Sequence, residues 1–592
     1  MKRLAVIILI LTLALSMIAG CSGNNTGQGG VSSGSASPAA SATPSQSSGS
    51  GNAGGSGGSG GGSTPVQPAP SAPAPVESSG VRMETFKAAT GEHVRYITEA
   101  PSVIKKADPT TLYVGQIVPI EMGNPGSASD SPLYHLIYDS FISIDYDTGE
   151  YIGSAFKEWE LAPDAKSLTF SIYENITFHD GSNATIDDIF YSLARFNDPT
   201  LSRQADRNIF GNIDFDNCEK FDDYNGKLVF FGPSINIIPG LTRCWVLSKN
   251  HIESKGEDNA WWDNTMGTGM YRVDSIVQGD RYNLVRTGNY WRGENGNFDK
   301  VVIRYYAEAG TMYIDYETGA LDIAVYPLVN DVRRVVNGDV QNTICDIYPM
   351  MINYNLIFNE EMNPILADIN VRRAICLAVD SAIVAKVAFD FMAVPARSLT
   401  PRGIVDTWLI EPSPDIDAAK QALAEAGYKP GEVKIVIGSN NQSANILMVE
   451  TIQAHLLEAG FAAELLIVDP TAHIVNFRNT GTDIYDISIG MLSVPTLNSA
   501  TMLGGNAYSC GATSFAAPTD PVADELALKA RNASSQAEKE AAMIEWQRYL
   551  IENYWIYPGV DASAAIIYRD YLTGLRAVVP REVNLEQVRL VG

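Results

Sequence analysis

Between residues 418 and 468, the hydrophobic and polar positions switch between the period of a helix and that of a strand. The pattern predicts, in order, a helix over 418–426, a strand over 433–437, a helix over 444–459 and a strand over 464–468. Gly427 and Gly460 follow the two helices, because glycine enters the left-handed conformation of a helix end freely. A strand, a helix and a second strand in this order form a β-α-β unit, so this part of the chain predicts a parallel sheet.

Further elements are predicted before and after this unit. The signals indicate strands over 111–117, 167–173 and 485–490 and a helix over 133–141. Thr185, followed by Asp187 and Asp188, predicts a helix start, because a hydroxyl can pair with a free backbone amide and carboxylates suit the helix dipole. Ligands of parallel sheets bind beyond the carboxyl ends of the strands, so the residues after these strands are candidate contacts.

The N-terminus has the pattern of an export signal. Lys2 and Arg3 precede an apolar run over residues 4–18, and small residues follow it up to Cys21. The run is shorter than the roughly 20 apolar residues of a membrane span. The Ile-Ala-Gly-Cys sequence that ends at Cys21 resembles the bacterial lipobox, in which the signal is cut before the cysteine and its sulfur carries diacylglycerol. We therefore expect residues 1–20 to be removed and Cys21 to anchor the chain to the cell membrane, outside the cytoplasm.

The segment after Cys21 has the composition of a tether. Residues 22–80 are almost wholly Gly, Ser, Ala and Pro, which leaves nothing to bury and predicts disorder. A flexible coil of this length has a reach of about 40–45 Å. We expect residues 21–107 to be a linker and N-terminal extension, and the sequence leaves open whether residues 81–107 fold.

Length and charge limit the class of the body. The chain has 592 residues, and the part after the linker is too long for one hydrophobic core, since cores stop growing at about 250–300 residues. Two or more lobes are therefore expected. The 68 acidic and 42 basic side chains leave a formal net charge of −26, which repels phosphate backbones and argues against nucleic acid as a partner.

The sequence contains little that points to catalysis or to a metal. The six histidines form no pair with metal-ligand spacing, so no metal site is predicted. No cofactor and no catalytic residue are predicted either. His179 and Asp180 suit a general base and its orienter, but Asp180 with the following glycine is a turn dipeptide and favours a surface turn. Residues 267–269, Gly-Thr-Gly, lack the further glycine and the lysine of a phosphate loop and favour a tight backbone crossing.

Five blocks of sequence follow one another in an order that is typical of one family. They lie within residues 158–188 (Glu-Trp-Glu, then Phe-His-Asp-Gly), 267–303 (Gly-Thr-Gly-Met-Tyr, then Asn-Tyr-Trp), 316–324, 353–380 and 424–428. From about residue 111 to residue 575, the chain resembles the extracellular solute-binding proteins of ABC importers, in the oligopeptide, dipeptide and nickel-binding class (family 5). Single blocks would be weak evidence, whereas five in sequence are strong.

The resemblance implies an α/β, two-lobed periplasmic-binding-protein-like fold of type II with an inserted third domain. The expected segments are lobe I over 108–143, 256–345 and 556–592, the inserted domain over 144–255 and lobe II over 346–555. A hinge motion of the lobes would enclose the ligand, as is typical of such receptors. The family carries out no catalysis, so the chain is not expected to be an enzyme.

The residues after the strand over 486–490 depart from the peptide binders of this family. There the strand usually leads into a Trp and then an Asp that pairs with the α-ammonium group of the peptide, whereas residues 491–497 contain neither. A buried ammonium group without a carboxylate is costly, so capture of a peptide N-terminus by that anchor is not expected. Placement at strand ends gives the candidate ligand contacts Gln116, Ile117, Met491, Leu492, Ser493 and Tyr508.

These observations predict a monomeric, membrane-anchored receptor that captures a small solute, a peptide or a peptide-like compound, for ABC permease subunits. A lipoprotein that feeds a membrane signalling receptor would have the same sequence features, and a neighbouring permease and ATPase would favour transport. An extracellular hydrolase is a third class, and its discriminator is a nucleophile with a base. The identity of the solute and its affinity stay open.

Overall fold

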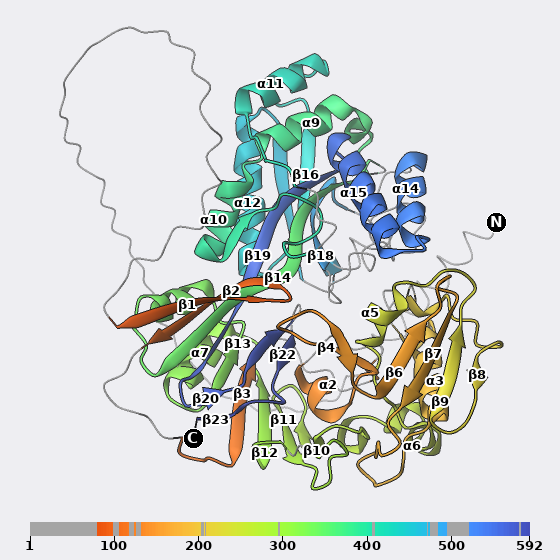
Figure 1. Ribbon diagram of the computed structural model, residues 1–592. Helices are drawn as coiled ribbons and strands as arrows, with labels where there is room; N and C mark the ends of the chain where they lie inside the picture. Colours follow the sequence, from red (N-terminus) through yellow and green to blue (C-terminus); the bar gives the residue numbers. More distant parts are fainter. Residues whose placement is uncertain are drawn as a thin grey trace, which may run out of the picture. The chain divides into compact units, whose positions relative to one another are not determined.

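A computed structural model gives the fold of the chain (Figure 1). It describes residues 80–98, 106–117, 124–125, 132–202, 207, 209–293, 296–360, 362–404, 409–469, 472–473, 484–493, 520–578 and 582–591. The chain divides into the units Met1–Ala69 and Pro70–Gly592, and the described residues all belong to the second. Within them, no helix is both long and apolar enough to cross a membrane. Cys21 and Tyr508 lie outside the described residues, so their roles stay predictions.

Thirteen of the described strands form one mixed sheet. Ten follow the order β10-β11-β12-β3-β13-β19-β14-β18-β16-β17, and β1, β2 and β15 pair beside this path. The strands are β1 (Val81–Ala88), β2 (Gly91–Thr98), β3 (Thr111–Gln116), β10 (Tyr271–Val277), β11 (Arg281–Arg286), β12 (Lys300–Tyr305), β13 (Ile323–Val325), β14 (Thr343–Phe358), β15 (Ala393–Pro395), β16 (Lys434–Asn440), β17 (Ala462–Val468), β18 (Ile487–Ser493) and β19 (Ile556–Arg569). The sheet and the helices that pack on it confirm the predicted α/β class.

The predicted β-α-β unit is present in this sheet. Strands β16 and β17 pair in parallel, and α12 (Ser443–Glu458) connects them. Helix α11 (Ile416–Glu425) precedes β16. Gly427 and Gly460 follow the two helices with φ angles of 88° and 98°, which are left-handed conformations that favour glycine.

Two long strands, β14 and β19, connect the two parts of the large sheet (Figure 1). Residues 343–349 of β14 pair with 563–569 of β19 beside β2 and β13, and residues 353–357 pair with 556–561 beside β18. Between these stretches the register shifts, and residues 350–352 stand opposite Ala562 alone. Met351, in the middle of this bulge, has a φ of 54°. The bulge therefore marks the point where one part of the sheet passes into the other.

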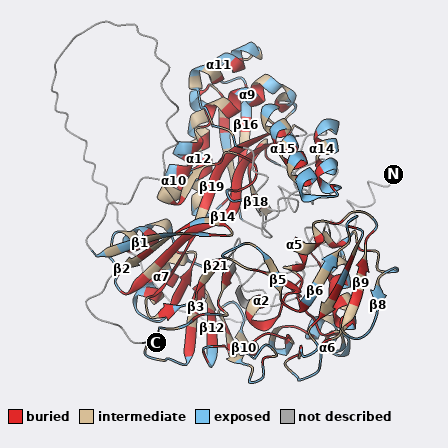
Figure 2. Cartoon of the chain, in the orientation of Figure 1, coloured by how far each residue is buried: buried red, intermediate tan, exposed pale blue. Residues whose placement is uncertain are grey.

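The two faces of β14 beyond this bulge are covered by different helices. Met351 and Ile357 share an apolar cluster with Trp546 of α15 (Gln536–Glu552). Tyr354 and its even-numbered neighbours share another cluster with α9 (Ile369–Ala378), α10 (Ser381–Phe389) and α12. Because successive strand residues point to opposite faces, the odd-numbered residues from 351 to 357 lie on the α15 side. Figure 2 shows these strands as buried and the outer helix surfaces as exposed.

A separate four-stranded sheet has the order β6-β7-β9-β8. Its strands are β6 (Phe156–Leu161), β7 (Ser167–Ile172), β8 (Glu219–Lys220) and β9 (Asn225–Val229). Helix α3 (Ile186–Asn197) packs against it through a shared apolar cluster. The helix begins after Thr185 as predicted, and the Thr185 N–H donates to Oδ2 of Asp188 at 2.9 Å.

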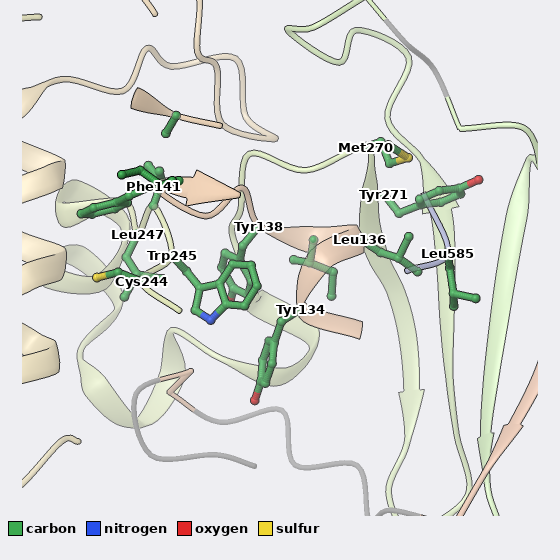
Figure 3. Packing of buried hydrophobic residues seen from close by; sticks show 14 of the residues in the cluster. Tyr134, Leu136, Tyr138, Phe141, Cys244, Trp245, Leu247, Met270, Tyr271 and Leu585 are labelled. Atoms are coloured by element: carbon green, nitrogen blue, oxygen red, sulfur yellow. The ribbon is translucent and has the colours of Figure 1, made fainter. Parts of the chain in front are cut away.

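Helix α2 (Pro132–Ile137) is shorter than the helix predicted over 133–141. The chain leaves the helix because the following residues bond to other segments; for example, the Asp139 N–H donates to Oγ1 of Thr268 at 3.1 Å. Trp245 packs beside the aromatic side chains of this segment (Figure 3). The apolar pattern therefore reflects burial at residues 134 and 136–141, whereas only the first part of the segment is helical.

Part of the segment 81–107, which the sequence left open, is folded. Strands β1 and β2 form an antiparallel hairpin, and β2 pairs with β14. At the turn of the hairpin, the Ala89 N–H donates to the Tyr146 carbonyl at 2.8 Å. Lys106 forms a buried ion pair with Asp322. These residues therefore belong to the folded body and not to the tether.

Short elements complete the described fold. They are β4 (Ile142–Ile144), β5 (Tyr151–Gly153), α5 (Ile237–Leu241), α6 (Lys249–Lys255), α7 (Ala309–Glu317), α8 (Val329–Val336), α14 (Pro521–Arg531), β20 (Leu572–Thr573), β21 (Arg576–Val578), β22 (Glu582–Asn584) and β23 (Arg589–Leu590), with single turns η1 (Glu257–Asn259), η2 (Trp262–Asn264), η3 (Pro364–Ala367) and η4 (Asp390–Met392). Strand β4 pairs with β5, β20 with β23 and β21 with β22.

Candidate functional site

Gln116 and Ile117 lie where β3 ends inside the large sheet. Gln116 stands between Tyr305 of β12 and Val325 of β13, and its carbonyl accepts a hydrogen bond from the Tyr306 N–H at 2.9 Å. Its side chain is buried, while Ile117 packs, partly buried, on the apolar cluster beside α7. Both residues are at a strand end, as expected, and their contact with a ligand stays a prediction.

Met491, Leu492 and Ser493 form the end of β18. They pair, in this order, with Tyr354, Asn353 and Ile352 of β14. Met491 packs against the cluster covered by α9, α10 and α12. Strands β13, β19 and β14 separate β3 from β18 in the sheet order, so the sheet does not place the two groups of predicted contacts side by side. Ligand contact by the β18 group also stays a prediction.

Three polar side chains gather on one face of β14 and β19, next to the bulge. Asn353 stands opposite Asp561, and Asn355 lies two residues further along the same strand and so on the same face. We call Asn353, Asn355 and Asp561 the polar triad. The two asparagines are fully buried, and Asp561 is 3% exposed. These residues are not among the contacts predicted from the sequence; the signal that could have pointed to the two asparagines is a pair of amides at alternate positions of an apolar stretch.

The segment after α10 supplies partners for the polar triad. Strand β15 pairs with β19, and Nδ2 of Asn353 donates to the Ser398 carbonyl at 2.8 Å. The Arg402 N–H donates to Oδ2 of Asp561 at 2.9 Å, and Nε of Arg402 lies 3.4 Å from Oδ1. Burial raises the pKa of Asp561, and the positive charge of Arg402 opposes this rise. Arg402 therefore offsets part of the cost of burying the carboxylate.

Helix α15 also binds the segment 398–402. Oε1 of Gln547 accepts hydrogen bonds from the N–H groups of Leu399 and Thr400, at 3.1 and 3.2 Å. Gln547 is fully buried, so these bonds form away from water. Residues 398–402 are thus fixed between α15 and the paired strands, which suits a site whose polar groups must be positioned before the ligand arrives.

His179 is bonded to the backbone on both sides of its ring. Nδ1 accepts a hydrogen bond from the Gly267 N–H at 3.3 Å, and Nε2, which then carries the proton, donates to the Gly269 carbonyl at 3.1 Å. Burial lowers the pKa of His179 to about 4. The turn at Asp180 is exposed as predicted, whereas the His179 ring is partly buried and serves to join two segments. A base that acts on a substrate needs a free ring nitrogen, and this arrangement provides none.

The close approach predicted for residues 267–269 is present. A Cβ atom on Gly267 or Gly269 would overlap the backbone at the end of α2. Glycine therefore lets this segment cross the helix end while it pairs with His179.

A second polar place in the fold is a cavity of about 200 Å³ between β4, β5 and the C-terminal strands. Its arginines pair with carboxylates: Arg576 with Asp147 at 3.2 Å, and Arg292 with Asp139 at 3.3 Å. Among the described residues, no group of histidine, cysteine, aspartate and glutamate side chains could hold a metal ion, here or elsewhere. The polar triad is the stronger candidate, because an acceptor oxygen of each of its three side chains receives no hydrogen bond in the described part of the chain.

Comparison with known proteins connects this fold with a sequence family. Residues 150–511, more than half of the chain, match the family described as bacterial extracellular solute-binding proteins, family 5 Middle. The glutathione-binding protein GsiB of Pectobacterium atrosepticum is 23% identical over 352 residues, which cover 58% of this chain and 67% of that protein.

Solved structures share the fold. The dipeptide-binding protein of Pseudoalteromonas sp. SM9913 in complex with Met-Leu superposes with a TM-score of 0.72 at 18% identity, covering 81% of this chain and 100% of the other. NikZ from Campylobacter jejuni in complex with Ni(L-His) superposes with a TM-score of 0.68 at 18% identity, covering 80% and 96%. The fold is thus the two-lobed, type II periplasmic-binding-protein fold that the sequence predicted. With the match over residues 150–511, the chain belongs to the bacterial extracellular solute-binding proteins, family 5.

Proposed function

We propose that the protein captures a peptide or peptide-like solute outside the cytoplasm and delivers it to the permease subunits of an ABC importer. Membership of family 5 is the observation that carries this proposal. Similar proteins are named for glutathione or were solved with a dipeptide or with Ni(L-His), so small polar compounds are the common ligand class.

The capture would use a hinge at β14 and β19. Lobe I would comprise residues 108–143, 256–345 and 556–592, the inserted domain residues 144–255, and lobe II residues 346–555. The bulge at residues 350–352 supports the boundary between residues 345 and 346, since it lies close to it; on β19 the corresponding point is Ala562. Closure about these strands encloses the ligand and presents one shape to the permease.

The protein would act by binding alone, as a monomer, with no bond made or broken. A lipid on Cys21 would hold it at the membrane, and the long Gly/Ser/Pro segment would let the body move there. The contacts proposed from the sequence are Gln116, Ile117, Met491, Leu492, Ser493 and Tyr508.

The experiment is mass spectrometry of the compound released from the purified protein, followed by calorimetry with that compound. We expect a peptide or peptide-like compound that binds one molecule per chain and is recovered unchanged after incubation. Recovery of a cleaved product would show an enzyme instead. Release of a sugar or a lipid, bound again in calorimetry, would overturn the peptide assignment.

A further inference from the structure

The polar triad carries three acceptor oxygens that receive no hydrogen bond in the described part of the chain. They are Oδ1 of Asn353, Oδ1 of Asn355 and Oδ1 of Asp561, all shielded from solvent. Native proteins keep such atoms few, because a buried acceptor that loses its hydrogen bond to water without a replacement lowers stability. Three of them on one face of two paired strands therefore call for a donor that completes the group.

The side chains around these oxygens fix their orientation. Nδ2 of Asn353 donates to the Ser398 carbonyl at 2.8 Å, and Nδ2 of Asn355 points to the Asn353 carbonyl at 3.5 Å. A rotation of the Asn353 amide would set its oxygen against the Ser398 oxygen. Asp561 receives the Arg402 N–H on Oδ2. Nε of Arg402 lies 3.4 Å from Oδ1 as an ion pair but makes no hydrogen bond to it, so Oδ1 can still accept one.

The spacing of the triad suits one small donor group. Asn353 and Asp561 are directly opposite each other, so their Cβ atoms lie about 4.5–5.5 Å apart, and Asn355 is the next residue on the same face, about 7 Å along the strand. A group that sits between them can approach all three oxygens. An ammonium group has three N–H donors and no acceptor, whereas a hydroxyl or a water also brings lone pairs that would face the carboxylate.

The negative charge around the triad also favours an ammonium group. Asp561 supplies a buried carboxylate whose charge Arg402 balances in part, and the chain as a whole carries a formal charge of −26, which attracts cations and repels anions. Strand β18 ends beside the triad, since Leu492 stands opposite Asn353. The sequence over residues 491–497 contains no carboxylate, whereas the triad beside the end of β18 supplies one from Asp561.

We propose that Asn353, Asn355 and Asp561 form the subsite that receives a primary ammonium group of the ligand, and so determine specificity for compounds with a free amine. The proposal rests on the proposed function, because it names the part of the solute that the protein recognises. Water bound at the triad is the alternative occupant, and the experiment separates the two.

The test compares tri-alanine with N-acetyl-tri-alanine by calorimetry on the full chain after its bound compound has been removed. Acetylation removes the ammonium group and leaves the rest of the peptide unchanged. In the wild type we expect tri-alanine to bind and the acetylated peptide to bind at least about 100-fold more weakly, since several charged hydrogen bonds are lost.

Two variants attribute this selectivity to the triad. Asn355→Leu keeps the branched shape of the side chain but replaces the amide oxygen and nitrogen by two methyl groups, and Asp561→Asn removes the charge. Each is expected to weaken tri-alanine binding about 10–100-fold and to leave the acetylated peptide unaffected. Ser192→Ala is the matched control, because it removes a buried, hydrogen-bonded hydroxyl of α3 and should lower the unfolding midpoint without changing the selectivity.

The possible outcomes distinguish a failure of the proposed ammonium subsite from a failure of the proposed solute-capture function. Equal binding of both peptides to the wild type, or wild-type selectivity in both triad variants, overturns the subsite and leaves solute capture standing. A raised unfolding midpoint of Asn355→Leu with unchanged selectivity identifies a water site and also overturns the proposal. Binding of neither peptide counts against the peptide function and the subsite together.

Discussion

The guanidinium group of Arg95 on β2 donates two hydrogen bonds to the carboxylate of Asp346 on β14, at 2.7 and 2.8 Å. The Asp346 side chain is 2% exposed, and its hydrogen bond to Arg95 raises the pKa of the arginine. Tyr568 O–H adds a weaker bond to the same carboxylate at 3.3 Å. This pairing fastens the N-terminal hairpin to the strand that links the two parts of the sheet.

Arg95→Met is expected to lower the free energy of unfolding by about 3 kcal/mol, because it leaves the buried Asp346 carboxylate without its cation. Urea unfolding measures this change. Arg82→Met is the control: its ion pair with Glu84 is exposed, and its loss should cost less than about 1 kcal/mol. If both variants lose the same small amount, the hairpin does not depend on the buried pair.

Stability should fall as the pH drops from 6.5 to 4, in part because of His179. Its pKa is about 4 in the folded protein and near 6.5 when unfolded, so in this window the unfolded chain takes up a proton that the folded chain does not. Above pH 6.5 both forms are neutral and the effect vanishes. The loss reaches up to about 3 kcal/mol by pH 4.

Urea unfolding of His179→Gln at pH 7, 5.5 and 4.5 checks this effect. The variant should lose stability at pH 7, because it loses the Gly267 and Gly269 hydrogen bonds in part, yet its dependence on pH should be shallower. The stability of the variant will still depend on pH to some extent, since burial also lowers the pKa of His93 to about 4. An unchanged slope in His179→Gln would mean that His179 is accessible to protons in the folded state.

The sequence predicted the elements whose signals are local. The β-α-β unit around α12 is one example, because strand residues, helix residues and the terminal glycines Gly427 and Gly460 all agree with it. The helix predicted over 133–141 fails at its end, since an apolar pattern does not distinguish helix from other buried chain. There Asp139 bonds to Thr268, which is distant in sequence and gives no local signal.

The polar triad could not be assembled from the sequence for the same reason. Asn353 and Asp561 belong to strands far apart in the chain, and their register depends on the bulge at residues 350–352 and on Gly559. A shift by one residue would place Asn353 on the other face. Strand ends can be predicted from the sequence, and for that reason Gln116 and Met491 are among the candidate ligand contacts. Which side chains meet at the bulge depends on the register between β14 and β19, which the sequence does not give.

Gly267→Ala is expected to destabilise the protein by about 3 kcal/mol, because the new Cβ would overlap the carbonyl oxygen of Ile137. Gly310→Ala is the opposite case: it lies in α7 with no atom within 4 Å of a new Cβ, and it should stabilise by about 0.5–1 kcal/mol. Thermal unfolding of both variants gives the comparison. A stable Gly267→Ala would contradict the tight crossing.

Cys21→Ser is expected to abolish the lipid and to release the protein from the membrane. The measurement is incorporation of radiolabelled palmitate in the native host, with immunoblots of membrane and soluble fractions. Cys218→Ser serves as the control, because Cys218 lies in the folded body next to β8 and should leave the label unchanged. Label retained by Cys21→Ser would show that the lipobox reading is wrong.

Gly559 is the residue at which β19 passes its second register shift against β14, between the partners of Tyr354 and Asn355. A Cβ on Gly559 would lie 2.6 Å from the Tyr354 carbonyl oxygen, so Gly559→Ala must push the two strands apart at this point. We expect a loss of about 1–3 kcal/mol in the free energy of unfolding.

The same separation of the strands would displace Asn355 from Asp561, because these two residues flank Gly559 in the paired strands. Gly559→Ala should therefore weaken binding of the compound released from the wild type by about tenfold or more, beyond what lost stability explains, since the variant remains folded at 25 °C. Calorimetry measures the affinity, and Gly288→Ala, whose new Cβ meets no atom within 4 Å, is the control. If Gly559→Ala is destabilised but still binds the compound with wild-type affinity, then ligand binding does not depend on the spacing of β14 and β19 at this point, and the site lies elsewhere in the fold.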